Sequence, residues 1–166
     1  MQLNARHDKR LAGAQGSFPT LTFTLIQKTK GKNMKDKLKP KKNADPYSKY
    51  VIRTDIKFKP LEKILADKII KDCRYDWFNQ TLCKLNNSVV RLGIFKGEFH
   101  FHKHDNEDEF FFVLDGAFYV DYENESVELK SNQGIVVPKG VVHRTRAPKR
   151  AVVLMVELDS VKATGD

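Results

Sequence analysis

The sequence predicts an all-β domain, a barrel or sandwich with one short helix, behind a basic N-terminal arm. Two observations support this fold class. From residue 81 onward, short β-prone segments follow one another with turn residues between them and little helix. Many short strands at close spacing are typical of antiparallel sandwiches and barrels. The second observation is the distribution of charge, which separates the arm from the domain.

The positive charge of the chain is concentrated at its N-terminal end. The 166 residues carry a formal net charge of +9. Residues 1–50 contain twelve Lys or Arg against three acidic residues, whereas residues 51–166 contain eighteen of each. We therefore expect a basic and largely disordered arm over residues 1–50 and a β-barrel domain over residues 51–166.

A lysine tract within the arm has two interpretations. It comprises Lys28, Lys30, Lys32, Lys35, Lys37, Lys39, Lys41 and Lys42. Such a run could tether nucleic acid or an anionic surface, but no aromatic side chains are interleaved for base stacking. We favour a solvated tail and expect no nucleic-acid partner except through this arm. The segment 21–26 is a candidate short strand, and Met34 is a candidate natural start.

The elements of the domain follow in order along the chain. Apolar residues at helical spacing over 60–70, with Pro60 in the first turn, predict a short amphipathic helix, although Ile69 and Ile70 could equally begin a strand. Turn pairs such as Lys96-Gly97 separate the strands that follow. The predicted strands are 81–85, 88–95, 98–103, 109–114, 117–122, 126–130, 134–137 and 150–157.

The cysteines and the apolar segments indicate the compartment. Cys73 and Cys83 lack C-x-x-C spacing, and we expect two reduced thiols rather than a disulfide. No run approaches the roughly 18 apolar residues of a membrane span. No apolar segment adjoins the basic N-terminal residues, as a secretory signal requires. We expect a cytoplasmic protein with no membrane partner; an acid-poor segment around Arg6 and Arg10 leaves an organelle transit peptide as the alternative.

Three histidines at every second position, His100, His102 and His104, precede Glu109. In an extended strand alternate side chains share a face, so these imidazoles should point one way, and Phe99 and Phe101 the other. A fourth histidine, His143, follows a proline-glycine turn about forty residues later. Imidazole and carboxylate suit a first-row transition metal. Taken alone, the first run could also be an acidic surface turn; the second element favours a metal pocket inside the barrel.

The surroundings of this pocket follow from the same alternation. Glu109 should share a buried face with two apolar residues of its strand, while Phe110, Phe112 and Leu114 line the other face. We expect an apolar lining from Phe111, Val113, Val136 and Val142, with Tyr119 or Tyr122 at an edge.

The residues that follow His143 should alternate between the two faces of their strand. Thr145 should face the pocket with His143, and Arg144 and Arg146 should point away from it. Without an inward cation for a phosphate group, the pocket is poorly suited to a phosphosugar.

Both histidine motifs resemble those of the cupin superfamily. Its first motif is His-x-His, three or four residues, Glu, six residues and Gly; its second contains Pro-x-Gly-x-x-His. Here the matching residues are His102, His104, Glu109, Gly116, Pro138, Gly140 and His143. The resemblance covers roughly residues 75–160 and implies a double-stranded β-helix, the jelly-roll barrel. More narrowly, the chain is similar to small single-domain cupins labelled mannose-6-phosphate isomerase-like, a label that identifies a fold rather than a reaction.

The resemblance also implies a ligand set and an assembly. His102, His104, Glu109 and His143 would hold a divalent transition metal, Fe, Mn, Ni or Zn, and the barrels would pair through their outer sheets as a homodimer. His100 is not a motif ligand. It could be a fifth polar group near the metal or a general base, but we favour a barrel-end histidine hydrogen-bonded to Glu98 or water.

The function we expect is that of a metal-binding cupin with a small organic molecule in its barrel. Three imidazoles and one carboxylate leave coordination positions open. We therefore expect a metal-dependent enzyme, an oxygenase or an isomerase. The alternative is a non-catalytic, metal-dependent module that binds or senses a small molecule.

Overall fold

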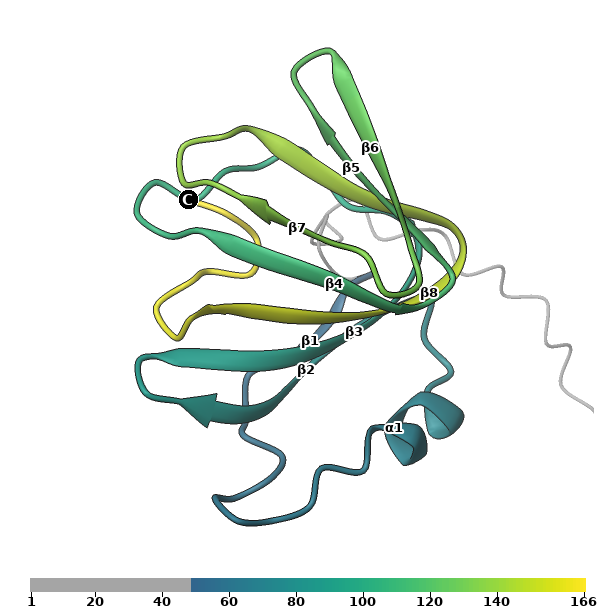
Figure 1. The fold of residues 1–166 in the computed structure, drawn as a ribbon, viewed down its shortest axis with the longest axis vertical. Helices are drawn as coiled ribbons and strands as arrows, with labels where there is room; N and C mark the ends of the chain where they lie inside the picture. The colour runs from purple at the N-terminus through teal and green to yellow at the C-terminus, as the bar shows by residue number, and fades with distance from the viewer. Residues whose placement is uncertain (1–48) are drawn as a thin grey trace, which may run out of the picture. The chain divides into compact units, whose positions relative to one another are not determined.

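The computed structural model describes residues 49–166 (Figure 1). The predicted basic arm, the candidate strand 21–26 and Met34 lie outside the described residues. The elements in chain order are β1 (Val51–Arg53), α1 (Ala66–Asp72), β2 (Trp77–Leu85), β3 (Ser88–Glu98), β4 (Glu109–Asp115), β5 (Ala117–Tyr122), β6 (Glu125–Lys130), β7 (Gly134–Val137) and β8 (His143–Leu158).

The strands form a jelly-roll barrel, which confirms the predicted all-β class. The strand order is β1-β2-β3-β8-β4-β7, and β5 pairs with both β6 and β8. The 16-residue β8 joins the two halves of the barrel. Its first residues pair with β5, and its second half pairs with β3 through residues 151–158 and with β4 through residues 152–156. All pairs are antiparallel except β1 with β2.

The core of the barrel is built from the inward faces of these strands. In β4, Glu109, Phe111 and Val113 are buried and alternate with less buried residues, as predicted. Phe118 and Val153 are completely buried in the same cluster. Each such side chain contributes about 1.5–3 kcal/mol to folding, so the barrel is a filled core that positions polar groups at one end.

A second apolar cluster lies outside the barrel, on the outer face of β2 and β3. Phe58, Phe78 and Leu82 are buried there, with Ile69 and Ile70 of α1 packed against them. The predicted helix exists, but it begins at Ala66 instead of Pro60. Leu61 has a φ of 66°, which is incompatible with a right-handed helix, so the segment before Ala66 is irregular.

The predicted strand 98–103 is wrong. A bulge between Phe95 and Gly97 and the φ of 105° at Gly97 turn the chain, and β3 ends at Glu98. Phe99 consequently lines the same cavity as His102 instead of the opposite face. Phe101 is 53% exposed. The strands that begin at 77 and 143 are both longer than predicted.

Two predicted lining residues are also wrong. Val136 and Val142 are 54% and 50% exposed. The register of β4 with β7 pairs Val136 with Phe110, which places it on the outer face. Val142 precedes the inward His143 and therefore points outward. The two cysteines, Cys73 and Cys83, are both free thiols, as expected. No helix within residues 49–166 is long and apolar enough to cross a membrane.

Candidate metal centre

Backbone hydrogen bonds hold two of the predicted ligands side by side. The His102 amide donates to His143 O over 2.9 Å, and the His143 amide donates to His102 O over 2.8 Å. This isolated antiparallel bridge brings both side chains to one face, and their ring centroids are 4.5 Å apart. The irregular segment after Gly97 is thereby fixed to the start of β8.

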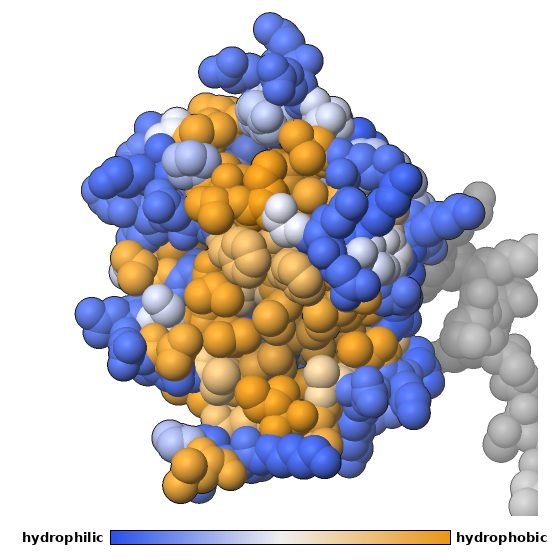
Figure 2. All heavy atoms as spheres, in the orientation of Figure 1, coloured by the Kyte–Doolittle hydropathy of each residue, from blue (hydrophilic) through white to orange (hydrophobic). Residues whose placement is uncertain are grey.

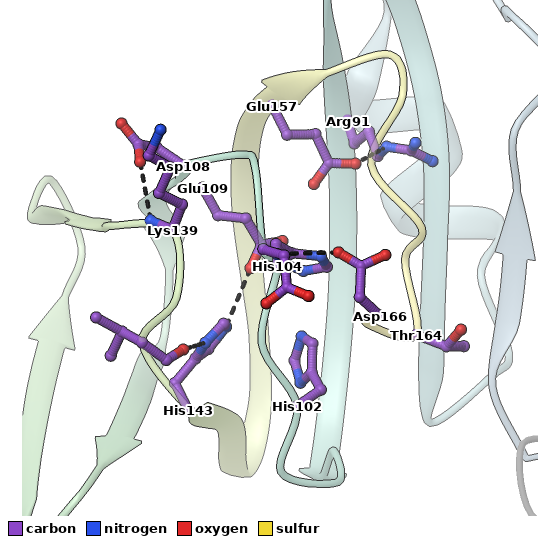
Figure 3. A network of polar contacts seen from close by, with 12 residues as sticks. Arg91, His102, His104, Asp108, Glu109, Lys139, His143, Glu157, Thr164 and Asp166 are labelled. Carbon is purple, nitrogen blue, oxygen red and sulfur yellow. Dashed lines mark hydrogen bonds and ion pairs between the residues drawn. The ribbon is translucent and has the colours of Figure 1, made fainter.

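Glu109, the first residue of β4, brings the carboxylate to the same point. Its Oε2 lies 3.0 Å from His143 Nε2 and 3.3 Å from His104 Nε2. His104 is positioned by the motif turn, since the Gly140 amide donates to His104 O over 2.7 Å. The candidate ligand atoms of His102, Glu109 and His143 all lie within 4.8 Å of one another. Figure 3 shows the four predicted residues converging.

Backbone carbonyls determine the tautomers of two histidines. His102 Nδ1 lies 3.1 Å from His100 O, and His143 Nδ1 lies 3.0 Å from Val141 O. Because a carbonyl only accepts, each Nδ1 must be the donor. In the neutral ring each Nε2 then presents a lone pair toward the Glu109 carboxylate. A cation between these groups satisfies all of them, and this Nδ1–H···O=C arrangement is the one that metal-binding histidines use.

Burial and neighbouring charge fix the protonation of the cluster. Burial, with the nearby His143 adding to it, lowers the pKa of His102 to about 4. Burial alone would raise the pKa of the Glu109 carboxyl, but the adjacent imidazoles of His104 and His143 outweigh it and hold that pKa well below its usual range. At neutral pH the cluster therefore contains a neutral His102 and an ionised Glu109.

A buried ion pair, Arg91–Glu157, lies beside the cluster and was not predicted (Figure 3). Both residues are 3% exposed. Burial raises the pKa of the Glu157 carboxyl, and Arg91 opposes that shift. The alternation of Val153, Met155 and Glu157 along β8 was the available signal, because it places all three on the inward face.

The cavity next to the cluster is small, about 30 Å³. Thr145 lines it, as predicted, and so does Asn79, whose buried Oδ1 accepts no hydrogen bond from the described residues. The lining residues are Ile52, Trp77, Asn79, Phe95, Phe99, His102, Glu109, Phe111, Thr145, Met155 and Ala163. Apart from a few polar groups, the walls are apolar, and the free volume accommodates only water-sized molecules.

The last residues of the chain close this end of the barrel. His100 Nε2 donates to Thr164 O over 2.8 Å, which places this histidine at the end of the barrel. The Asp105 amide donates to the Asp166 carboxylate over 2.9 Å. Val161 is buried. We refer to residues 160–166 as the C-terminal strap.

The two arginines beside His143 point away from the cavity, which confirms their predicted orientation. Arg144 Nε and Arg146 Nε donate to Asp121 Oδ2 over 3.0 and 2.8 Å. Their guanidinium groups lie over the rings of Phe101 and Tyr119. No arginine therefore reaches the cavity from this part of β8.

A jelly-roll barrel with a His/Glu cluster at one end defines a cupin-type protein, and comparison with known proteins agrees. Residues 94–157 match the cupin domain family. The uncharacterized protein YdbB of Bacillus subtilis (strain 168) is 42% identical over 98 residues, which cover 58% of this chain and 85% of that protein. The chain belongs to the cupin superfamily.

Solved structures show the same fold. A cupin-2 domain protein from Shewanella frigidimarina NCIMB 400 superposes with a TM-score of 0.55 at 24% identity, covering 57% of this chain and 93% of that one. Protein NMB1881 from Neisseria meningitidis gives a TM-score of 0.52 at 23% identity, covering 58% and 99%. These similarities extend to the barrel architecture.

Proposed function

We propose that this cupin holds one divalent transition metal, Fe, Mn, Ni or Zn, on His102, His104, Glu109 and His143. The observation that carries the proposal is the convergence of the ligand atoms of His102, Glu109 and His143 within 4.8 Å. Three imidazole nitrogens and one carboxylate oxygen are a donor set that first-row metals accept.

The hydrogen bonding of the cluster supports a cation. Neither ring nitrogen of His104 makes a hydrogen bond of normal geometry to a described residue, although the side chain is buried. Among the described residues its closest polar neighbour is Glu109, whose Oε2 lies 3.3 Å from His104 Nε2, and a buried imidazole paired so incompletely is costly. The tautomers of His102 and His143 likewise direct lone pairs toward Glu109. A metal bound there would satisfy these groups together.

We further propose that the protein acts on a small organic molecule, as an oxygenase or an isomerase. A bound metal would polarise a substrate oxygen, lower the pKa of a bound water or, if redox-active, bind O₂. The chain itself supplies apolar walls, including Phe99 and Phe111, that exclude water and select an apolar substrate body. Thr145 and Asn79 Oδ1, which accepts no hydrogen bond from residues 49–166, would supply polar contacts that orient it.

A second candidate function is non-catalytic binding or sensing of a small molecule. The filled barrel speaks against turnover, since its cavity of about 30 Å³ is far below the about 300–1,000 Å³ usual for sites that enclose an organic molecule. The two candidates share the metal and differ in turnover, so metal content has to be established first.

The test is elemental analysis of the purified full chain beside two variants. We expect stoichiometric metal in the wild type, loss of the metal in the His102→Ala/His143→Ala double variant, and retention in His100→Ala, which changes a neighbouring non-ligand histidine. Iron, manganese or nickel would direct the next assay to O₂ consumption, and zinc to isomerisation or hydrolysis. A wild-type protein that contains no metal and does not bind added metal would refute the proposal.

We also propose a cytoplasmic homodimer that pairs through the outer sheet. Apolar side chains gather on the face of the barrel that Figure 2 presents. On the outer face of β4 and β7, Val136 is 54% exposed beside the half-buried Phe110 and Phe112. Sedimentation should give a dimer for the wild type and a monomer for Phe112→Glu. Phe101→Glu is the control: it introduces the same charge at an exposed aromatic residue outside β4 and β7, and this variant should remain a dimer. A wild-type protein that sediments as a monomer would refute the pairing.

A further inference from the structure

A second cavity lies outside the barrel, between α1 and the outer face of β1 and β2. Its volume is about 410 Å³, within the range of small-molecule sites, and it shares no lining residue with the cavity beside the histidines. We call it the α1 groove. It is lined by Arg53, Lys57, Phe58, Leu65, Lys68, Ile69, Asp72, Cys73, Tyr75, Phe78 and Gln80.

The α1 groove exists because α1 covers the outer sheet only in part. No residue of α1 is fully buried. The end of the helix is fixed, since Arg150 donates to Ile70 O over 2.5 Å and Ile69 and Ile70 pack on the outer cluster. Leu65, the residue before the helix, remains 51% exposed. A gap is therefore left between the N-terminal end of α1 and the strands.

The floor of the groove is apolar and its mouth is open. Phe58, Cys73 and Phe78 are 5–8% exposed and form the base. Tyr75 is stacked on Phe78, with ring centroids 5.9 Å apart and an interplanar angle of 9°, yet it is 50% exposed. An apolar body inserted beside Tyr75 and Leu65 would remove their exposed surface from water, which is favourable at about 25 cal/mol per Å².

The rim of the groove is positively charged. Arg53, Lys57 and Lys68 stand against a single acidic lining residue, Asp72. Within residues 49–166 none of the three cations forms an ion pair, and the Arg53 guanidinium is held 5.5 Å over the ring of Phe78. Cations that form no ion pair with the described residues, at the edge of an apolar cavity, are complementary to a ligand with an apolar body and an anionic head.

We propose that the α1 groove binds an amphipathic organic anion, such as a medium-chain carboxylate, with its chain on Phe58 and Phe78 and its head at the basic rim. This site is independent of the metal proposed above. The first fifty residues of the chain are a poor occupant because they carry twelve basic against three acidic residues and share the sign of the rim. A second protein copy would have to present an acidic surface to it.

The test is a titration of the full chain with decanoate, followed by amide chemical shifts, beside neutral 1-decanol as the control ligand. We expect saturable shifts confined to α1 and to the start of β2, and weaker binding of decanol. Lys68→Glu should weaken decanoate binding about tenfold, because it replaces an attraction by a repulsion. Lys71→Glu is the matched control: it makes the same charge change on the same helix, outside the groove, and should bind like the wild type.

Several outcomes would overturn the proposal. They are the absence of saturable binding, equal weakening by Lys68→Glu and Lys71→Glu, and shifts centred on the histidine cluster. A change of oligomeric state in Lys68→Glu alone would assign the groove to a second copy of the chain instead. Lys68 and Lys71 are both exposed, so we expect both variants to fold like the wild type.

Discussion

Gly165 of the C-terminal strap lies against His102, in a position that only glycine can occupy. Its φ is 88°, and a Cβ built there would lie 2.6 Å from His102 Cβ. Atoms do not approach that closely, so any other residue must displace the strap or the histidine. The packing of the strap and the position of one proposed metal ligand are therefore coupled.

Gly165→Ala should weaken metal binding about tenfold, because the added methyl group moves His102 away from Glu109 and His143. A shift of a ligand or of its support typically costs 10–100-fold in metal affinity. Competition with a chromogenic chelator measures the effect. Gly97→Ala is the matched control: it imposes the same kind of strain at a φ of 105°, but its Cβ would meet nothing within 4 Å. Equal affinities in the two variants would contradict the coupling.

The fold was largely predictable because its turns are encoded locally. Gly116, with a φ of 85°, marks the hairpin between β4 and β5; β5 has the predicted bounds, and β4 begins where predicted and ends one residue later. The error over 98–103 has the opposite origin. That segment has strand-like alternation, but beyond Glu98 its contact with β8 is reduced to the Phe99 amide bond to Thr145 and the isolated bridge between His102 and His143, which are long-range contacts.

The candidate site was predictable as far as its motifs extend. His102, His104, Glu109 and His143 were found because two short motifs contain them all. Other residues near the histidine cluster were not predicted, because the register of β3 with β8 and the C-terminal strap place them there. They are Arg91, Glu157, Ala163, Thr164 and Asp166. No local pattern reveals that a C-terminal segment returns to the mouth of a barrel.

Breaking the Arg91–Glu157 pair should be strongly destabilising. Glu157→Leu leaves the Arg91 cation buried and unpaired, and we expect a loss of about 3–5 kcal/mol in the free energy of unfolding. The double variant Arg91→Met/Glu157→Leu removes both charges and should recover most of that loss. Urea unfolding in the presence of a chelator measures both without interference from metal. A double variant as unstable as Glu157→Leu would show that packing, rather than the lone charge, sets the cost.

Removing the metal should lower the melting temperature. A ligand that binds only the folded state at 100 times its Kd stabilises that state by about 2.7 kcal/mol, which corresponds to a shift on the order of 10 °C in a domain of this size. Thermal unfolding with and without EDTA measures the shift. The His102→Ala/His143→Ala variant should melt at one temperature under both conditions; an EDTA effect of equal size in that variant would place the metal elsewhere.

The ion-pair network of Asp121 should make stability depend on pH in the acid range. Burial raises the pKa of Asp121, but hydrogen bonds from Arg146, Ser126 and Arg144 outweigh it, so the folded-state pKa lies below the ordinary value. A depressed pKa stabilises the fold above the unfolded-state pKa of about 3.9, and that stabilisation is lost as the pH falls through the folded-state value.

Asp121→Asn should therefore melt about 3–6 °C below the wild type at pH 7, as expected for a loss of roughly 1–2 kcal/mol from hydrogen bonds to charged groups that are partly exposed. The difference should stay constant down to about pH 5 and shrink below pH 4, where the wild-type carboxyl also becomes neutral. Asp159→Asn is the control, because the Lys84–Asp159 pair is exposed to solvent and should contribute little. A difference for Asp121→Asn that persists unchanged to the lowest pH would mean that the shape of the side chain, and not its charge, stabilises this part of β5.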